Sequence, residues 1–373
     1  INGQSAISSR LEFMMLKILT IVGARPQFIK AAAVSRVIRN DHAGTIEEIL
    51  VHTGQHYDTN MSQVFFDELD IPHPKFNLEI SGGTHGVMTG RMLEAIENVL
   101  LSEKPDWVLI YGDTNSTLAG ALAAAKLHIP VAHVEAGLRS FNMRMPEEIN
   151  RILADRVSNL LFCPTEVAVE NLAREGVTKG VSLVGDVMYD VSLYYRDVAR
   201  SRSDALDRFN LKEGEYVLAT CHRAENTDDP TRLREIGLAL ADLAANQAVI
   251  LPVHPRTAKI MADQGLIAAM RNVKLVDPLP FLDMIRLEQS ARVIVTDSGG
   301  VQKEAFFYDV PCVTMRDETE WVETVELGWN VLTGASRERI LSAASSPARP
   351  VEKGNLPYGD GKASEKIVAA LST

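Results

Sequence analysis

Apolar residues occur in two kinds of run along this chain. Short continuous runs rich in β-branched residues are typical of strands buried in a parallel sheet. Longer runs, in which apolar residues recur every three or four positions, are typical of helices that pack on such a sheet. The two kinds of run alternate, which predicts an α/β fold built on parallel sheets.

The first half of the chain predicts strands at 17–22, 47–53, 107–111, 131–134 and 160–163, and helices at 26–39, 60–69, 87–102, 115–127 and 146–157. The second half predicts strands at 216–221, 248–253, 273–276, 292–296 and 311–314, and helices at 230–246, 280–289, 300–308 and 361–371. Pro26, Pro146 and Pro230 each fall at or just before the first turn of a helix, where the missing N–H is tolerated. The halves share no repeat of fixed period.

A length of 373 residues is long for one hydrophobic core and favours more than one domain. We predict an N-terminal Rossmann-like domain at 15–195, a charged connecting segment at 196–214, a C-terminal Rossmann-like domain at 215–358 and a final helix within 359–373. Residues 1–14 show no periodicity, and we interpret them as a disordered cloning remnant outside the fold.

Composition narrows the classes of function. The net charge of −11 argues against general affinity for nucleic acid or anionic membranes, so an anionic ligand needs a local basic site. Cys163, Cys221 and Cys312 lie in apolar runs without metal-ligand or CxxC spacing, which favours a reduced cytoplasmic protein. No apolar run approaches the roughly 18 residues that a membrane span requires.

Polar side chains follow directly after several predicted strands. They are Arg25, Asp113, Glu135, His222, His254 and Asp297 with Ser298. In open parallel sheets, ligands bind outside the carboxyl ends of the strands. Half of these residues precede position 190 and half follow position 215, which predicts an active site in a cleft between two domains.

The turn Ser298-Gly299-Gly300 lies between a strand and a helix. Its backbone N–H groups therefore belong to a helix N-terminus, which favours a bound phosphate. The glycines also allow a ligand to approach the backbone closely. The alternative is an ordinary tight turn. Neither GxGxxG nor GxxxxGK[ST] occurs in the chain, so the turn is not a recognisable dinucleotide fingerprint or P-loop.

Arg25 and Lys30 lie where the first strand passes into the first helix. Both can reach a diphosphate, the arginine as a fork and the lysine as a point charge. The alternative is a pair of solvated cations. Their position at the same sheet edge as the other candidates favours the binding function.

Asp113, Glu135 and Glu147 supply three carboxylates within one half of the chain. Carboxylates that converge in one site have their pKa values pushed apart, which separates acid from base. Taken singly, Asp113 could cap the following helix, and Glu147 could merely complement a helix dipole.

Two histidines follow neighbouring strands, His222 in CHRAEN and His254 in VHPR. Each alone is more often structural than catalytic. Metal binding is not indicated, because His52 and His56 straddle a strand-to-loop junction and no HExxH occurs.

Seven motifs in one order carry a family resemblance. They are GARPQFIK, GDTNSTLAGALAA, HVEAGLRS, MPEEINR, HRAEN, HPR and TDSGGVQKEA. With them, the chain from Met15 onward resembles the non-hydrolysing UDP-N-acetylglucosamine 2-epimerases. The resemblance implies two Rossmann-like domains of the glycosyltransferase-B type, a UDP-sugar in the interdomain cleft, a C-terminal helix that crosses back onto the first domain, and a homodimer. It implies no metal and no redox cofactor.

The resemblance also assigns roles. Asp113, Glu135 and Glu147 match the carboxylates of acid–base catalysis, and His222 matches a histidine beside the diphosphate. The nucleotide contacts correspond to Arg25, Lys30, Ser298, Gly299 and Gly300, with Glu304 on the ribose hydroxyls. The reaction implied is elimination of UDP to a 2-acetamidoglucal and re-addition with inversion at C2.

Two segments depart from the commonest family pattern. Trp321 stands where an arginine is expected, and HTGQHYDTNMSQVFF differs from the QHREM pattern that contributes to a regulatory site in some members. Both resemble relatives that act on UDP-2,3-diacetamido-2,3-dideoxyglucuronate. We hypothesise that Trp321 packs on a 3-acetamido methyl group and that Arg316 or Arg144 meets the uronate carboxylate.

The sequence therefore predicts a UDP-sugar 2-epimerase for surface polysaccharide synthesis. The family pattern favours conversion of UDP-GlcNAc to UDP-ManNAc, with the diacetamido uronate as the alternative substrate. A glycosyltransferase of the same fold would use similar nucleotide contacts but needs an acceptor site. A UDP-sugar sensor would have no need of three carboxylates around C2.

Overall fold

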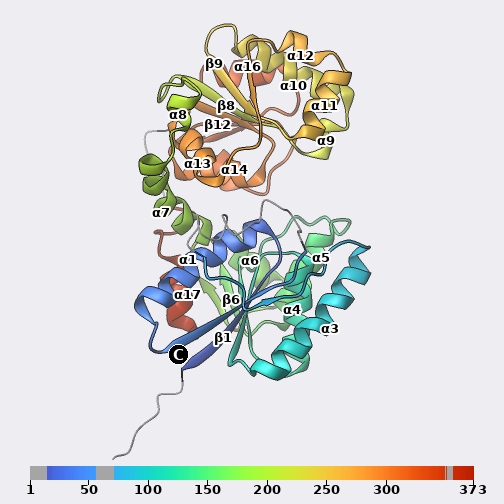
Figure 1. Cartoon of the computed structure of the whole chain (residues 1–373), viewed down its shortest axis with the longest axis vertical. Coiled ribbons are helices and arrows are strands. Elements are labelled where there is room, and N and C mark those ends of the chain that lie inside the picture. The colour runs from blue at the N-terminus through green and yellow to red at the C-terminus, as the bar shows by residue number, and fades with distance from the viewer. Residues whose placement is uncertain (1–14, 56–70, 349, 351–355) are drawn as a thin grey trace, which may run out of the picture. The chain divides into compact units, whose positions relative to one another are not determined.

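The computed structural model describes residues 15–55, 71–348, 350 and 356–373. The chain divides into two compact units (Figure 1). The first contains the chain up to Asp190 together with Tyr358–Thr373, and the second runs from Val191 to Pro357. The predicted helix at 60–69, the interpretation of residues 1–14, and most of the segment HTGQHYDTNMSQVFF lie outside the described residues.

The first unit is built on a seven-stranded parallel sheet in the order β3-β2-β1-β4-β5-β6-β7. The strands are β1 (Leu16–Val22), β2 (Ile46–His52), β3 (Phe76–Asn77), β4 (Trp107–Tyr111), β5 (Val131–Val134), β6 (Leu160–Cys163) and β7 (Val181–Leu183). The chain order reverses between β1 and β4, the point where open α/β sheets bind ligands. Continuous apolar runs form the strands because helices cover both faces of the sheet.

The helices of this unit are α1 (Arg25–Asp41), α3 (His85–Glu103), α4 (Asn115–Lys126), α5 (Pro146–Val157), α6 (Glu166–Arg174) and α17 (Ala363–Leu371). Helix α4 packs closely on the sheet, since a Cβ at Gly120 would lie 2.7 Å from Cδ1 of Ile21. Helix α17 contacts α1, as the red and blue ribbons show in Figure 1. Asp190 accepts hydrogen bonds from the first backbone N–H groups of α17, at Ala363 and Ser364.

The second unit repeats the architecture with six parallel strands in the order β10-β9-β8-β11-β12-β13. They are β8 (Tyr216–Thr220), β9 (Ala248–Pro252), β10 (Lys274–Val276), β11 (Val293–Thr296), β12 (Cys312–Thr314) and β13 (Asn330–Leu332). The helices are α8 (Ala205–Arg208), α9 (Ala224–Thr227), α10 (Pro230–Leu243), α11 (Pro255–Asp263), α12 (Leu266–Ala269), α13 (Phe281–Ser290), α14 (Gly299–Phe307), α15 (Val322–Glu326) and α16 (Arg337–Ser345). The order again reverses, between β8 and β11.

The prediction of strands at 107–111, 131–134 and 160–163 and of a helix at 146–157 is confirmed to the residue. The segment 196–214 was predicted to connect the two domains. Those residues contain the end of helix α7 (Val187–Arg202) and the short helix α8, and they belong to the second unit. Charged side chains there lie on helix surfaces, a pattern that composition alone does not separate from a linker.

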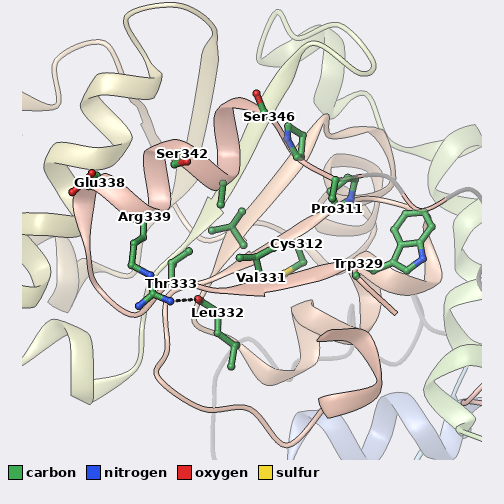
Figure 2. Close-up of a pocket in the computed structure, with 15 residues that line it drawn as sticks. Pro311, Cys312, Trp329, Val331, Leu332, Thr333, Glu338, Arg339, Ser342 and Ser346 are labelled. Atoms are coloured by element: carbon green, nitrogen blue, oxygen red, sulfur yellow. Dashed lines mark hydrogen bonds between the residues drawn. The ribbon is translucent and has the colours of Figure 1, made fainter. Parts of the chain in front are cut away.

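A cavity of about 600 Å³ lies beside β12, β13 and α16 (Figure 2). Arg339, one of the residues that line it, donates a hydrogen bond of 2.7 Å to the carbonyl oxygen of Leu332 (Figure 2). Its described lining contains none of the site residues predicted from the sequence. Among the described helices, none is long and apolar enough to cross a membrane.

Candidate active site

The turn after β1 is fixed by Gln27. The backbone N–H groups of Gly23 and Ala24 donate to Oε1 of Gln27 at 2.8 and 3.1 Å. The Gln27 amide nitrogen in turn donates to the carbonyl oxygen of Tyr111 at 2.7 Å. This buried amide therefore ties the turn to the end of β4, across the point where the strand order reverses. Arg25, the first residue of α1, is exposed beside this turn.

Lys30 and Glu135 form an ion pair in which both side chains are largely buried. Glu135 follows β5 with φ of 73°, in the left-handed region that few residues other than glycine adopt. Gly112, after β4, also has positive φ, and a Cβ there would lie 3.3 Å from Oε2 of Glu135. The two turns are thus in close contact. Lys30, which the sequence predicts at a diphosphate, here neutralises one of the predicted catalytic carboxylates.

Asp113 lies beside this pair and contacts Arg151 of α5, with 2.5 Å between Oδ2 and Nη2. Burial raises the pKa of Asp113. The negative charges of Glu135 and Glu147 raise it further, against the positive charges of Arg151 and Lys30. Asp113 does not cap helix α4, because the cap is Thr114, whose side chain accepts from the N–H of Thr117. The sequence analysis had left helix capping open as an alternative function of Asp113.

Glu147 lies partly exposed in the first turn of α5, next to a carboxylate that the sequence analysis did not select. Glu148 is buried and accepts hydrogen bonds from the N–H groups of Ser140 and Phe141, both at 2.9 Å, and from Arg151 at 2.6 Å. Burial opposes ionisation, but these hydrogen bonds lower the pKa of Glu148. Glu147 and Glu148 are neighbours in the motif MPEEINR, and only their contacts in the structure show that Glu148 is the structural residue.

In the second unit, Ser298 caps α14 by accepting from the N–H of Val301 at 3.4 Å. A Cβ at Gly299 would lie 2.3 Å from Oε1 of Glu320. A carboxylate therefore already lies against the N-terminus of α14. Glu320 also pairs with Arg316 at 2.8 Å. Burial opposes ionisation of Glu320, but the charge of Arg316 is the main effect that lowers its pKa.

Asp297 organises the HRAEN loop. Its fully buried carboxylate accepts from the N–H groups of His222 and Arg223 and from the side-chain amide of Asn226, all at 3.1 Å. Nδ1 of His222 lies 3.5 Å from Asp297, and its imidazole is more than half exposed. His254 instead caps α11, with its Nδ1 accepting from the N–H of Arg256. Both histidines are exposed.

Trp321 is only 7% exposed. The ammonium nitrogen of Lys303 lies 4.0 Å from the centre of its ring, so one face of the indole is covered by α14. The indole nitrogen lies 3.3 Å from where a Cβ of Gly299 would be. Glu304 is partly exposed on the same helix. Its charge, with burial as the larger cause, raises the pKa of the neighbouring Glu288.

A cavity of about 860 Å³ opens at the carboxyl ends of β9 and β10. It is lined by residues that include Arg208, Phe209, Val253, Asp277 and Pro280. The sequence analysis did not select this space, because its lining is mostly apolar side chains and loop prolines. In the described part of the chain, no group of three or more His, Cys, Asp or Glu side chains could hold a metal ion.

The structure thus assembles the predicted residues in two sets. Lys30, Asp113 and Glu135 come together at the carboxyl edge of the first sheet, with Arg151 added to the predicted set. His222 and the turn at Ser298 meet through Asp297 at the corresponding edge of the second sheet.

Comparison with known proteins gives consistent matches. A family model described as UDP-N-acetylglucosamine 2-epimerase matches residues 38–372. UDP-2,3-diacetamido-2,3-dideoxy-D-glucuronate 2-epimerase of Pseudomonas aeruginosa is 55% identical, over 96% of this chain and 99% of the relative. A UDP-N-acetylglucosamine 2-epimerase homolog of Methanococcus maripaludis is 53% identical, over 95% and 99% of the two chains.

Among solved structures, that of Methanocaldococcus jannaschii UDP-GlcNAc 2-epimerase in complex with UDP-GlcNAc and UDP superimposes with a TM-score of 0.82. The sequences are 43% identical, and the match covers 96% of this chain and 99% of the other. The predicted fold class, α/β with two Rossmann-like sheets of the glycosyltransferase-B type, is confirmed by this match and by the two strand orders.

Proposed function

The chain belongs to the UDP-N-acetylglucosamine 2-epimerase family, and from this premise we propose that it inverts C2 of UDP-2,3-diacetamido-2,3-dideoxy-D-glucuronate. We choose this sugar because the chain is 55% identical, along almost the full length of both chains, to a relative named for that substrate. Trp321, at a position where the commoner pattern has arginine, supports the same choice.

The reaction requires acid–base groups because the C2 proton is adjacent to no carbonyl. Cleavage of the C1–O bond sends its electron pair to UDP and leaves positive character at C1, which acidifies the C2 proton. A carboxylate takes that proton as the C1–C2 double bond forms. Protonation of C2 from the opposite face and return of UDP to C1 then give the epimer. Such a step needs at least two positioned acid–base groups.

The surroundings of Asp113 and Glu135 suggest which carboxylate donates a proton and which accepts one. We assign Asp113 as a proton donor, because burial and the neighbouring carboxylates raise its pKa. Glu135, paired with Lys30, is the carboxylate that accepts a proton. Glu147 is the third carboxylate of the acid–base set, and its charge also raises the pKa of Asp113. The roles of Asp113 and Glu135 exchange in the reverse reaction.

The second unit would bind the nucleotide. The N-terminus of α14 at Ser298, Gly299 and Gly300 suits a diphosphate, and His222 would stabilise the charge on departing UDP. Since Glu320 lies against Gly299, diphosphate binding there requires this carboxylate to move. Arg25 would add a diphosphate contact, and Glu304 would contact the ribose hydroxyls.

The uronate carboxylate needs a cation. Arg316 is already paired with Glu320, whereas Arg144 is exposed in the loop that leads to Glu147. We therefore propose that Arg144 binds the uronate carboxylate and that Trp321 packs on the 3-acetamido methyl group.

Turnover in D₂O tests the reaction itself. We expect deuterium at C2 of the sugar with UDP still attached, because the proton taken by a carboxylate exchanges with solvent before return. Full epimerisation with retention of the original C2 hydrogen would contradict elimination. A new glycosidic bond would indicate a transferase, and accumulation of free UDP with free sugar would indicate hydrolysis.

Exposed apolar side chains on the first unit support the proposal of a homodimer. Ile149 and Leu153 lie one turn apart on α5, and Phe141 and Met143 are exposed in the preceding loop. We propose that a second copy covers this surface. Light scattering after gel filtration should give twice the chain mass of 41.0 kDa, and a monomer at all concentrations would contradict it.

A further inference from the structure

A histidine that the proposed reaction does not use lies directly behind its carboxylates. His133, on β5, is 0% exposed. Its Nε2 lies 2.7 Å from the carbonyl oxygen of Gly112, and its Nδ1 lies 2.7 Å from Oδ1 of Asp155 on α5. Both ring nitrogens therefore face an oxygen at hydrogen-bonding distance.

The identity of these oxygens determines where the protons are. A backbone carbonyl only accepts, so Nε2 carries a proton. Oδ2 of Asp155 also accepts from Arg139 at 2.8 Å and from the N–H of Gly137 at 3.2 Å. Burial opposes ionisation of Asp155, but the contacts with His133 and Arg139 lower its pKa. With both of these donors on Oδ2, Asp155 acts as an acceptor, and a hydrogen bond from His133 to its Oδ1 requires a proton on Nδ1 as well.

The other ionisable groups near the ring do not change the requirement for a proton on each ring nitrogen. Arg139 is held by Glu175 as well as by Asp155, through hydrogen bonds of 2.7 and 2.8 Å to the two Glu175 oxygens. The Cys163 thiol on β6 stays neutral, because burial and then the charge of Asp155 raise its pKa to about 12. Oδ1 of Asp155 is therefore the buried counter-ion for a His133 ring that carries both protons.

His133 is connected to both turns that present the catalytic carboxylates. Its ring holds the carbonyl of Gly112, whose φ is 62° and which directly precedes Asp113. Its backbone lies two residues before Glu135, whose φ is 73°. The His133 ring therefore contacts the turn before Asp113, and its backbone leads into the turn at Glu135, where a positive φ is strained for a residue other than glycine.

We propose that His133 is a doubly protonated positioning residue for the reaction. It fixes the Gly112–Asp113 turn and the start of the Glu135 turn, and it supplies a buried positive charge behind them. The catalytic part of this inference rests on the proposed function, since that function assigns Asp113 and Glu135 to proton transfer. The protonation state does not rest on it.

Nitrogen-15 NMR of the full-length protein at neutral pH tests the protonation state without any substrate. We expect two ring N–H signals of His133, with both nitrogens in the protonated range, and both should disappear in His133→Gln. A single N–H with the other ring nitrogen unprotonated would overturn the proposal, whatever the enzyme's activity.

Kinetics with the proposed substrate test the positioning role. In His133→Gln, the glutamine amide can still donate to Gly112 but the charge is lost. We expect kcat to fall at least about tenfold and KM to change less than about threefold. His42→Gln, a partly exposed position after α1, is the matched control and should retain wild-type kinetics. An unchanged kcat in His133→Gln would contradict the positioning role.

The double variant His133→Gln/Asp155→Asn separates charge from packing and serves if His133→Gln alone folds poorly. Its two amides can hydrogen-bond to each other without any charge. We expect the melting temperature to recover while kcat stays reduced. Recovery of wild-type kcat would show that a neutral hydrogen bond suffices, and that the buried charge has no role.

Discussion

Arg151 contacts two carboxylates whose pKa values shift in opposite directions. One guanidinium nitrogen contacts Asp113 and the other contacts Glu148. Glu148 also accepts from two backbone N–H groups, which stabilise its charge, and its pKa is lowered. The pKa of Asp113 is raised by burial and then by two nearby carboxylates, and Asp113 lacks such donors among its described contacts. A shared cation therefore does not decide the direction in which each pKa shifts; burial and the remaining neighbours do.

Substitution of the three predicted carboxylates should affect turnover more than binding. We expect Asp113→Asn, Glu135→Gln and Glu147→Gln each to lower kcat by about 10²-fold or more, the usual effect of losing a positioned acid or base, with a smaller change in KM. Glu94→Gln, at an exposed position on α3, is the control. Near-normal kcat in all three variants would show that these carboxylates are structural.

Glu148 should contribute to stability, and this contribution should depend on pH. Its folded pKa is lowered, so the stabilisation is present above the unfolded value of about 4.3 and is lost as pH falls through the folded pKa. Glu148→Gln should lower the free energy of unfolding at pH 7 by about 1–3 kcal/mol, and the difference from wild type should shrink in acid. Urea unfolding at several pH values measures it, and a difference that persists or grows in acid would contradict this role.

The arrangement of strands and helices explains which parts of the site the sequence could predict. Residues that directly follow strands, such as Asp113, Glu135 and Ser298, were found because parallel strands place their ends at one edge. Partners that approach from helix surfaces, such as Arg151 and Glu148, were missed. Nothing in the local pattern separates them from solvated charges. The short edge strands β3, β7 and β13 were missed because two or three residues are too few for a pattern.

The turn at the start of α14 gives a prediction about nucleotide binding. We expect Ser298→Ala to weaken UDP binding only modestly, by about 1 kcal/mol, and Gly299→Val to weaken it severely by filling the space at the helix N-terminus. Calorimetry with UDP measures both. Unchanged affinity in Gly299→Val would remove this turn from the site.

A second variant separates two causes of that loss. A side chain at Gly299 would also meet Glu320, at 2.3 Å from the position of its Cβ. In Gly299→Val/Glu320→Ala this contact is absent. A loss of UDP affinity that persists in this double variant would show that the valine side chain itself excludes the diphosphate. Full recovery of affinity would mean that displacement of Glu320 alone had caused the loss.

Considered as a whole, the molecule repeats one architecture with two unrelated sequences. Each sheet reverses its strand order between the first and fourth of its strands along the chain, and each carries polar side chains at that reversal. The first unit holds the paired carboxylates, and the second holds the helix N-terminus with His222. In the proposed function, acid–base groups and anion-binding groups are thus built on separate sheets within a chain of net charge −11.

The relative rates with two sugars provide the most direct test of the proposed substrate. We expect kcat/KM for UDP-2,3-diacetamido-2,3-dideoxy-D-glucuronate to exceed that for UDP-GlcNAc, with UDP itself still bound. The reason is our proposal that the exposed Arg144 binds the uronate and that Trp321 packs on the second acetamido group. A preference for UDP-GlcNAc of tenfold or more, about 1.4 kcal/mol in transition-state binding, would contradict the account.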